Sequence, residues 1–64
     1  MYAKYAKLRD ERAMNDNEVA KAIGISNAIL SEWKSEKHIP SLQTMFKIAK
    51  FFDVPIETFL QEEI

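Results

Sequence analysis

The chain has 64 residues, nine basic and ten acidic side chains, one histidine and no cysteine, and a formal net charge of −1. One domain is the most that this length supports, and without cysteine the chain has neither disulfides nor thiolate zinc sites. The single histidine, His38, cannot by itself build a metal site of the usual kind. Apolar residues form 47% of the chain, with one glycine and two prolines, which favours a helical globular domain over disorder, a sandwich or a barrel.

The first predicted helix runs from about Tyr2 to Arg12. Tyr5 and Leu8 lie three residues apart, Tyr2 lies a further turn away, and charged residues separate them, which is typical of an amphipathic helix. Four basic and two acidic residues in this segment make the helix net positive.

The second predicted helix runs from about Asp16 to Ile23. Asn15 followed three residues later by Glu18 predicts a capping box at its start. Gly24 falls where a residue in the left-handed conformation would end the helix. The apolar residues of the segment share one face: Val19, Ala20 and Ile23.

The third predicted helix follows a capping Ser26 and ends near Ser35. Leu30 and Trp33 lie one turn apart, so we expect both in the core. The rest of the helix surface is small and polar, with Ile29 as the one bulky exception. Its members are Asn27, Ala28, Ser31, Glu32 and Ser35. An ordinary solvated face is the plainest interpretation, but long Lys and Glu side chains are more usual there.

Two further helices complete the pattern. Ser41 is a good cap for a fourth helix, whose apolar residues recur at spacings of three and four and predict one buried side: Leu42, Met45, Phe46, Ile48, Ala49 and Phe52. Pro55 fixes the entry to a fifth helix from Ile56 to about Glu62, with Ile56, Phe59 and Leu60 on one face. The chain is therefore predicted to be all-α, with five helices and no strand.

The second and third segments together have the form of a helix-turn-helix. The sequence NDNEVAKAIGISNAILSEWKSEKHIP, residues 15–40, resembles the signature of the Cro/C1-type (XRE-like) helix-turn-helix domain. Leu8 and Arg9, with Arg12, resemble the first-helix element of that family, and PSLQTMFKIAKFFDVPIETFL resembles its fourth and fifth helices. The resemblance implies a compact five-helix bundle of the lambda-repressor-like DNA-binding type, with residues 1–64 as one domain.

The resemblance also implies which residues meet DNA, because the family places its third helix in the major groove. The implied base-reading residues are Asn27, Ala28, Ile29, Ser31 and Glu32. Asparagine pairs with adenine, glutamate accepts from cytosine N4, and alanine or isoleucine touches a thymine methyl group. The implied phosphate contacts are Asn15, Asp16, Ser26, Lys37, His38 and Ser41, with backbone amides at the starts of the second and fourth helices.

The sequence departs from the family pattern at several positions. Asp16 stands where members usually carry glutamine, and Glu36 and Asp53 stand where glycine is common. Lys34 replaces a glutamate that commonly pairs with the first-helix arginine, so we expect Arg9 to lack its usual partner. Between residues 15 and 41, three lysines face four acidic residues, which is weakly acidic for a nucleic-acid binder.

The predicted function is that of a sequence-specific transcriptional regulator, with repression favoured, which binds a double-stranded DNA operator as a homodimer. We expect Phe51, Ile56 and Ile64 to form the dimer interface, although Ile56 could instead complete the core. The alternative is a protein-interaction module on the same fold, such as an antitoxin-like or adaptor domain.

The sequence predicts neither a catalytic site nor a metal, cofactor or small-molecule site. No apolar run approaches the roughly 18 residues that cross a bilayer, and the N-terminus lacks the apolar region of a signal peptide. We therefore expect a cytoplasmic protein without membrane contact.

Overall fold

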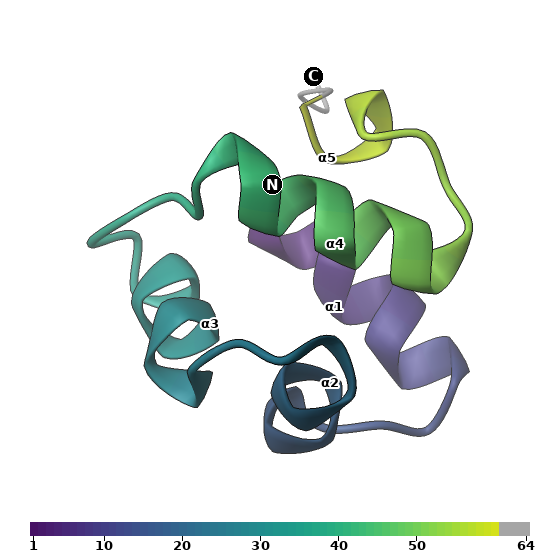
Figure 1. The fold of residues 1–64 in the computed structure, drawn as a ribbon, viewed down its shortest axis with the longest axis horizontal. Helices are drawn as coiled ribbons and strands as arrows, with labels where there is room; N and C mark the ends of the chain where they lie inside the picture. The colour runs from purple at the N-terminus through teal and green to yellow at the C-terminus, as the bar shows by residue number, and fades with distance from the viewer. Residues whose placement is uncertain (61–64) are drawn as a thin grey trace.

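The computed structural model describes residues 1–60, which contain five helices and no strand. The helices are α1 (Tyr2–Glu11), α2 (Asp16–Ile23), α3 (Asn27–Lys34), α4 (Leu42–Phe52) and α5 (Glu57–Leu60). In Figure 1, α1 and α4 occupy the middle of the molecule, α2 and α3 lie below and to the left, and α5 lies above. The predicted bounds of α2 are confirmed. The fifth helix begins one residue later than predicted, and its expected end at Glu62 falls outside the described residues.

The predicted caps begin three of the helices. The Asn15 side chain accepts a hydrogen bond from the Glu18 amide at 2.8 Å, and the Glu18 carboxylate accepts one from the Asn15 amide at 3.0 Å. Ser26 accepts from the Ala28 amide, and Ser41 accepts from the Thr44 amide, both at 3.2 Å. Each cap satisfies an amide that has no partner within its own helix.

Helices α1 to α4 all end in the same way. A residue with positive φ follows each helix, and the next amide donates back to a carbonyl five residues earlier, as in a Schellman motif. The positive-φ residues are Ala13, Gly24, Glu36 and Asp53. The returning bonds are Met14 to Arg9 (3.1 Å), Ile25 to Ala20 (3.0 Å), Lys37 to Glu32 (2.9 Å) and Val54 to Ala49 (3.0 Å). Only the second of these turns uses glycine.

The core contains side chains from all five helices. Its buried members are Tyr5, Val19, Ala20, Leu30, Trp33, Met45, Ile48, Ala49, Phe52 and Phe59. Trp33 is 2% exposed and lies within 6.2 Å, ring centre to ring centre, of Tyr2, Tyr5 and Phe59. The prediction that Trp33 belongs to the core is confirmed, and the aromatic cluster ties α3 to α1 and α5.

The predicted buried side of α4 was too wide. Leu42 is 63% exposed and Phe46 is 54% exposed, although the pattern placed both in the core. The residues that are buried form a narrower stripe of Met45, Ile48, Ala49 and Phe52. Phe46 lies about 100° around the helix from Met45, and Leu42 lies in the first turn. Leu60, which was predicted to share a face with Phe59, is 51% exposed, whereas Phe59 is buried as predicted.

Candidate nucleic-acid interface

The candidate interface is built on α2 and α3, which pack against each other across the turn at Gly24. Ala20 is only 3% exposed, and its small side chain suits the close packing of the two helices. Leu30 and Trp33, on the inner face of α3, are buried in the core and fix the position of the helix. The opposite face of α3 is therefore free to meet a ligand.

The outer face of α3 carries the five residues predicted to read bases. Asn27, Ala28, Ser31 and Glu32 are exposed, while Ile29 is half-buried. They offer an amide, a hydroxyl, a carboxylate and apolar groups within two turns of helix. This combination of donors, acceptors and apolar groups matches the kinds of groups that base edges present in the major groove.

A surface hollow joins α3 to the start of α4. It is lined by Ile29, Glu32, His38, Ile39, Pro40, Ser41 and Thr44. The structure thus brings two predicted base-reading residues together with two predicted phosphate contacts, His38 and Ser41. Lys37 precedes them in the same connection and is exposed.

The other predicted phosphate contacts lie at helix starts. Asn15, Ser26 and Ser41 are exposed, but their side-chain oxygens already accept capping hydrogen bonds. The Ser41 hydroxyl also donates to Thr44 Oγ1 at 3.1 Å. Between residues 15 and 41, three lysines and three glutamates are exposed, whereas Asp16 is half-buried.

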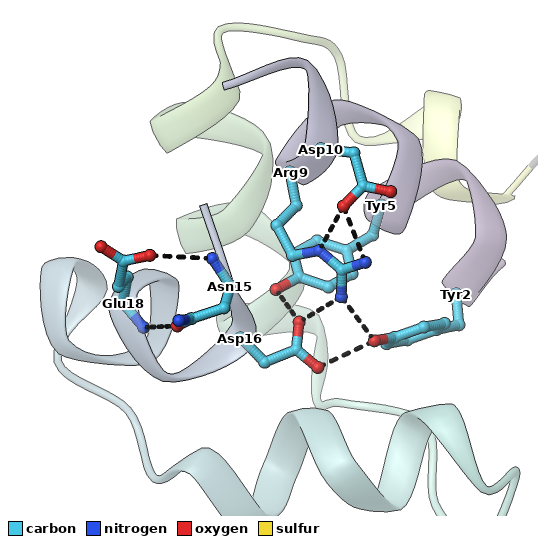
Figure 2. A network of polar contacts seen from close by, with 7 residues as sticks. All are labelled: Tyr2, Tyr5, Arg9, Asp10, Asn15, Asp16 and Glu18. Atoms are coloured by element: carbon cyan, nitrogen blue, oxygen red, sulfur yellow. Dashed lines mark hydrogen bonds and ion pairs between the residues drawn. The ribbon is translucent and has the colours of Figure 1, made fainter. Parts of the chain in front are cut away.

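Asp16 is held by α1 (Figure 2). Tyr5 Oη and Arg9 Nη1 donate to Asp16 Oδ1 at 2.7 and 2.8 Å, and Tyr2 Oη donates to Oδ2 at 2.8 Å. Arg9 also donates to the Tyr2 hydroxyl and forms an ion pair with Asp10. The carboxylate at the first residue of α2 is thus neutralised from α1.

The network shifts the acidities of its members. Burial alone would raise the pKa of Asp16, but the hydrogen bonds from Arg9, Tyr5 and Tyr2 outweigh it and lower that pKa. Burial, followed by the hydrogen bond to Asp16, raises the pKa of Tyr2 and of Tyr5. The hydrogen bond to Asp16 likewise raises the pKa of Arg9. These shifts favour a charged Arg9 and Asp16 beside neutral tyrosines.

Within the described residues, Arg9 has no hydrogen-bond or ion-pair partner in α3, in line with the expectation that it lacks its usual partner there, and it pairs with Asp16 of α2 instead. Sequence reasoning did not find the four-residue cluster. One signal was available, because Tyr2, Tyr5 and Arg9 are spaced by three and four residues and share one face of α1. That spacing does not reveal which residue of another helix they meet.

Two of the three residues expected at a dimer interface lie within the described part of the chain, and both are half-buried. Phe51 is half-buried, and Arg12 lies over its ring at 5.2 Å while donating to its carbonyl oxygen at 3.0 Å. Ile56 is half-buried and packs against the core. Ile64 lies outside the described residues.

Within residues 1–60, no helix combines the length and the apolar character needed to cross a membrane. The same part of the chain holds no group of three or more histidine, aspartate or glutamate side chains arranged to hold a metal ion.

A family model described as helix-turn-helix matches residues 6–59. The chain belongs to the Cro/C1-type helix-turn-helix family. This Cro/C1-type domain is 39% identical over 61 residues to an uncharacterized HTH-type transcriptional regulator of Methanocaldococcus jannaschii, a match that covers 89% of the chain and 92% of the relative. It is 35% identical over 60 residues to the cryptic phage CTXphi transcriptional repressor RstR of Vibrio cholerae.

That second match covers 94% of the Cro/C1-type chain but 54% of RstR. The HTH-type transcriptional regulator SutR of Escherichia coli is 33% identical over 54 residues, which cover 84% of the chain and 30% of SutR. The chain therefore spans about half or less of these two longer relatives. No solved structure gives a significant match.

Proposed function

We propose that the chain is a single DNA-binding domain that regulates transcription by placing α3 in the major groove. The observation that carries this proposal is the exposed outer face of α3, backed by the buried Leu30 and Trp33. A rigid helix that presents short polar side chains suits direct reading of base edges. The printed names of the relatives, which include a transcriptional repressor, support the same function and favour repression.

The proposed contacts divide into reading and positioning. Asn27, Ala28, Ile29, Ser31 and Glu32 read bases, whereas the starts of α2 and α4 and the α3–α4 connection meet phosphates. The phosphate contacts are Asn15, Asp16, Ser26, Lys37, His38 and Ser41, with Asp16 contributing its backbone amide because its carboxylate faces α1. Phosphate contacts fix the orientation of the domain and carry no sequence information.

The proposed domain acts as a homodimer on a pseudo-palindromic operator. A face with equal numbers of exposed lysines and glutamates gains little from phosphates, so a second domain on the same duplex is needed for useful affinity. A dimer would hold its two α3 helices about one DNA turn, roughly 34 Å, apart.

One observation favours a protein-binding function instead. Ile39, Leu42 and Phe46 are each more than half exposed, and such side chains are typical of protein interfaces when they gather on one surface. Salt separates the two functions, because DNA binding releases counterions and weakens steeply as salt rises. A complex held by apolar area need not weaken in this way.

Selection of preferred duplexes from a random pool tests the DNA-binding proposal directly. On the selected duplex, Asn27→Ala or Glu32→Ala should cost about 1–3 kcal/mol of binding free energy and leave binding to random DNA nearly unchanged. Lys37→Ala should weaken binding to every duplex and reduce the salt slope by about one.

Fluorescence anisotropy at several salt concentrations measures both effects. Equal losses for all three variants on every duplex would contradict the assignment of α3 as the reading helix. Failure of the selection to enrich any sequence would favour the protein-binding function.

A further inference from the structure

The first residue of α2 carries a charge of the wrong sign for a DNA-facing position. Asp16 lies next to Asn15, at the end of α2 that the proposed function turns toward phosphates. A free carboxylate there would repel DNA, since like charges at short range weaken binding. DNA binding through the start of α2 therefore requires that the negative charge of Asp16 be offset.

Residues on one face of α1 offset this charge. Three donors, Tyr2, Tyr5 and Arg9, engage both oxygens of Asp16 at 2.7 to 2.8 Å. The Asp16 side chain is 21% exposed and that of Arg9 is 19% exposed, so the pair is largely shielded from water. Figure 2 shows the carboxylate turned toward α1, with the guanidinium beside it.

We propose that Arg9 is a positioning residue for DNA binding, and this inference rests on the proposed function. Arg9 acts through Asp16, because it draws the carboxylate to α1 and offsets its charge. The same guanidinium also pairs with Asp10, but the Asp10 side chain is 68% exposed, whereas that of Asp16 is 21% exposed. At the start of α2, the Asp16 charge is then offset, and the exposed Glu18 carboxylate accepts the Asn15 amide in the capping box. Tyr2 and Tyr5 fix the geometry of the pair while staying neutral themselves.

Four variants distinguish two ways in which the Arg9–Asp16 pair can affect DNA binding, by offsetting the Asp16 charge or only by stabilising the fold. Arg9→Met leaves the carboxylate uncompensated, and Asp16→Asn removes the charge while keeping an acceptor oxygen for Arg9 or Tyr5. The double variant Arg9→Met with Asp16→Asn has the net charge of the wild type but lacks the ion pair. Lys7→Met removes one exposed positive charge from the same helix and is the matched control.

Binding to the selected duplex and to a random duplex is measured for each variant at two salt concentrations, under conditions in which circular dichroism shows the variant folded. Arg9→Met should weaken binding to both duplexes by about tenfold and leave their ratio unchanged, whereas Lys7→Met should weaken it less than about twofold. Asp16→Asn should bind at least as tightly as the wild type. The double variant should return to within about twofold of the wild type, although the folded protein is less stable.

A purely structural role for the network gives the opposite pattern. Asp16→Asn would then weaken binding, and the double variant would be at least as weak as Arg9→Met. Either result overturns the inference while leaving the proposed function intact. A wild-type chain that binds neither duplex overturns the proposed function and this inference with it.

Discussion

Asp16 is the first residue of α2, but its side chain accepts hydrogen bonds from three residues of α1. Its three hydrogen bonds come from residues of α1 that lie 7 to 14 positions earlier in the chain. The network therefore links α1 to the start of α2. No buried side-chain nitrogen or oxygen within the described residues lacks a hydrogen-bond partner. The polar cluster therefore adds specificity to the packing without leaving an unsatisfied group.

The lowered pKa of Asp16 predicts how stability responds to acid. A carboxylate whose pKa is lower in the folded than in the unfolded state stabilises the fold fully above its unfolded value of about 3.8. This contribution disappears as the pH falls from there through the folded pKa. Wild-type stability should therefore decrease more steeply than that of Asp16→Asn as the pH falls below about 4.

Urea unfolding at a series of pH values, followed by the fluorescence of Trp33, measures this difference. Glu11→Gln removes an exposed carboxylate from α1 outside the network and serves as the baseline. Parallel acid profiles for the wild type and Asp16→Asn would show that the network does not stabilise the ionised carboxylate.

At the scale of the helices, the sequence predicted where they begin better than where they end. Three helix starts followed from the capping side chains of Asn15, Ser26 and Ser41, because a cap is local and chemically distinctive. Of the four left-handed ends, only Gly24 was predicted. Ala13, Glu36 and Asp53 adopt the same conformation without a residue type that prefers it strongly.

The candidate site also has a part that the sequence predicted and a part that it did not. The exposed α3 face was predictable, because the helical period separates it from Leu30 and Trp33. The Arg9–Asp16 pair was not, because it depends on how α1 crosses the start of α2. The exposure of Leu42 and Phe46 also depends on tertiary packing, since periodicity gives the direction of an apolar face and not the width that neighbouring helices cover.

Gly24 provides a test of the helix-turn-helix connection. Its φ of 74° is left-handed, and a Cβ placed there meets no atom within 4 Å, so a substitution is costly through backbone strain and not through collision. Gly24→Val should cost roughly 1–2 kcal/mol and lower the melting temperature by several degrees. Gly24→Asn should cost less, because asparagine tolerates this conformation.

Thermal unfolding followed by circular dichroism measures both variants. A valine variant as stable as the wild type would contradict the left-handed turn at Gly24.

At the scale of the whole molecule, the proposed function requires two domains to assemble on one duplex. The predicted interface uses Phe51 and Ile56, both half-buried, while Phe46 on the same helix as Phe51 is 54% exposed. The two phenylalanines therefore mark two different surfaces of α4 on which a second copy could pack.

Sedimentation of the free chain, of a half-site complex and of a full palindrome complex tests the dimer. We expect two chains on the palindrome, with higher affinity per half-site than on the isolated half-site. Phe51→Ser should abolish this gain, whereas Phe46→Ser, the matched change on the other surface, should preserve it. Circular dichroism confirms that each variant is folded. Monomers with equal affinity per half-site on both duplexes would contradict the dimer, and the reverse response of the two variants would move the interface to the Phe46 surface.

The repeated left-handed helix ends also bear on how this sequence tolerates change. Ala13 and Glu36 each hold a conformation that costs an L-residue roughly 1–2 kcal/mol, whereas Asp53 holds it at lower cost because aspartate tolerates it better. Glycine would avoid this strain at the expense of a freer unfolded chain. None of the three is a buried residue. A mutation that weakens the small core could therefore be compensated by glycine at one of these turns, far from the damaged packing. The connections between helices therefore offer positions where a substitution can raise stability. The core, with ten buried side chains among the described residues, is close-packed and offers fewer such positions.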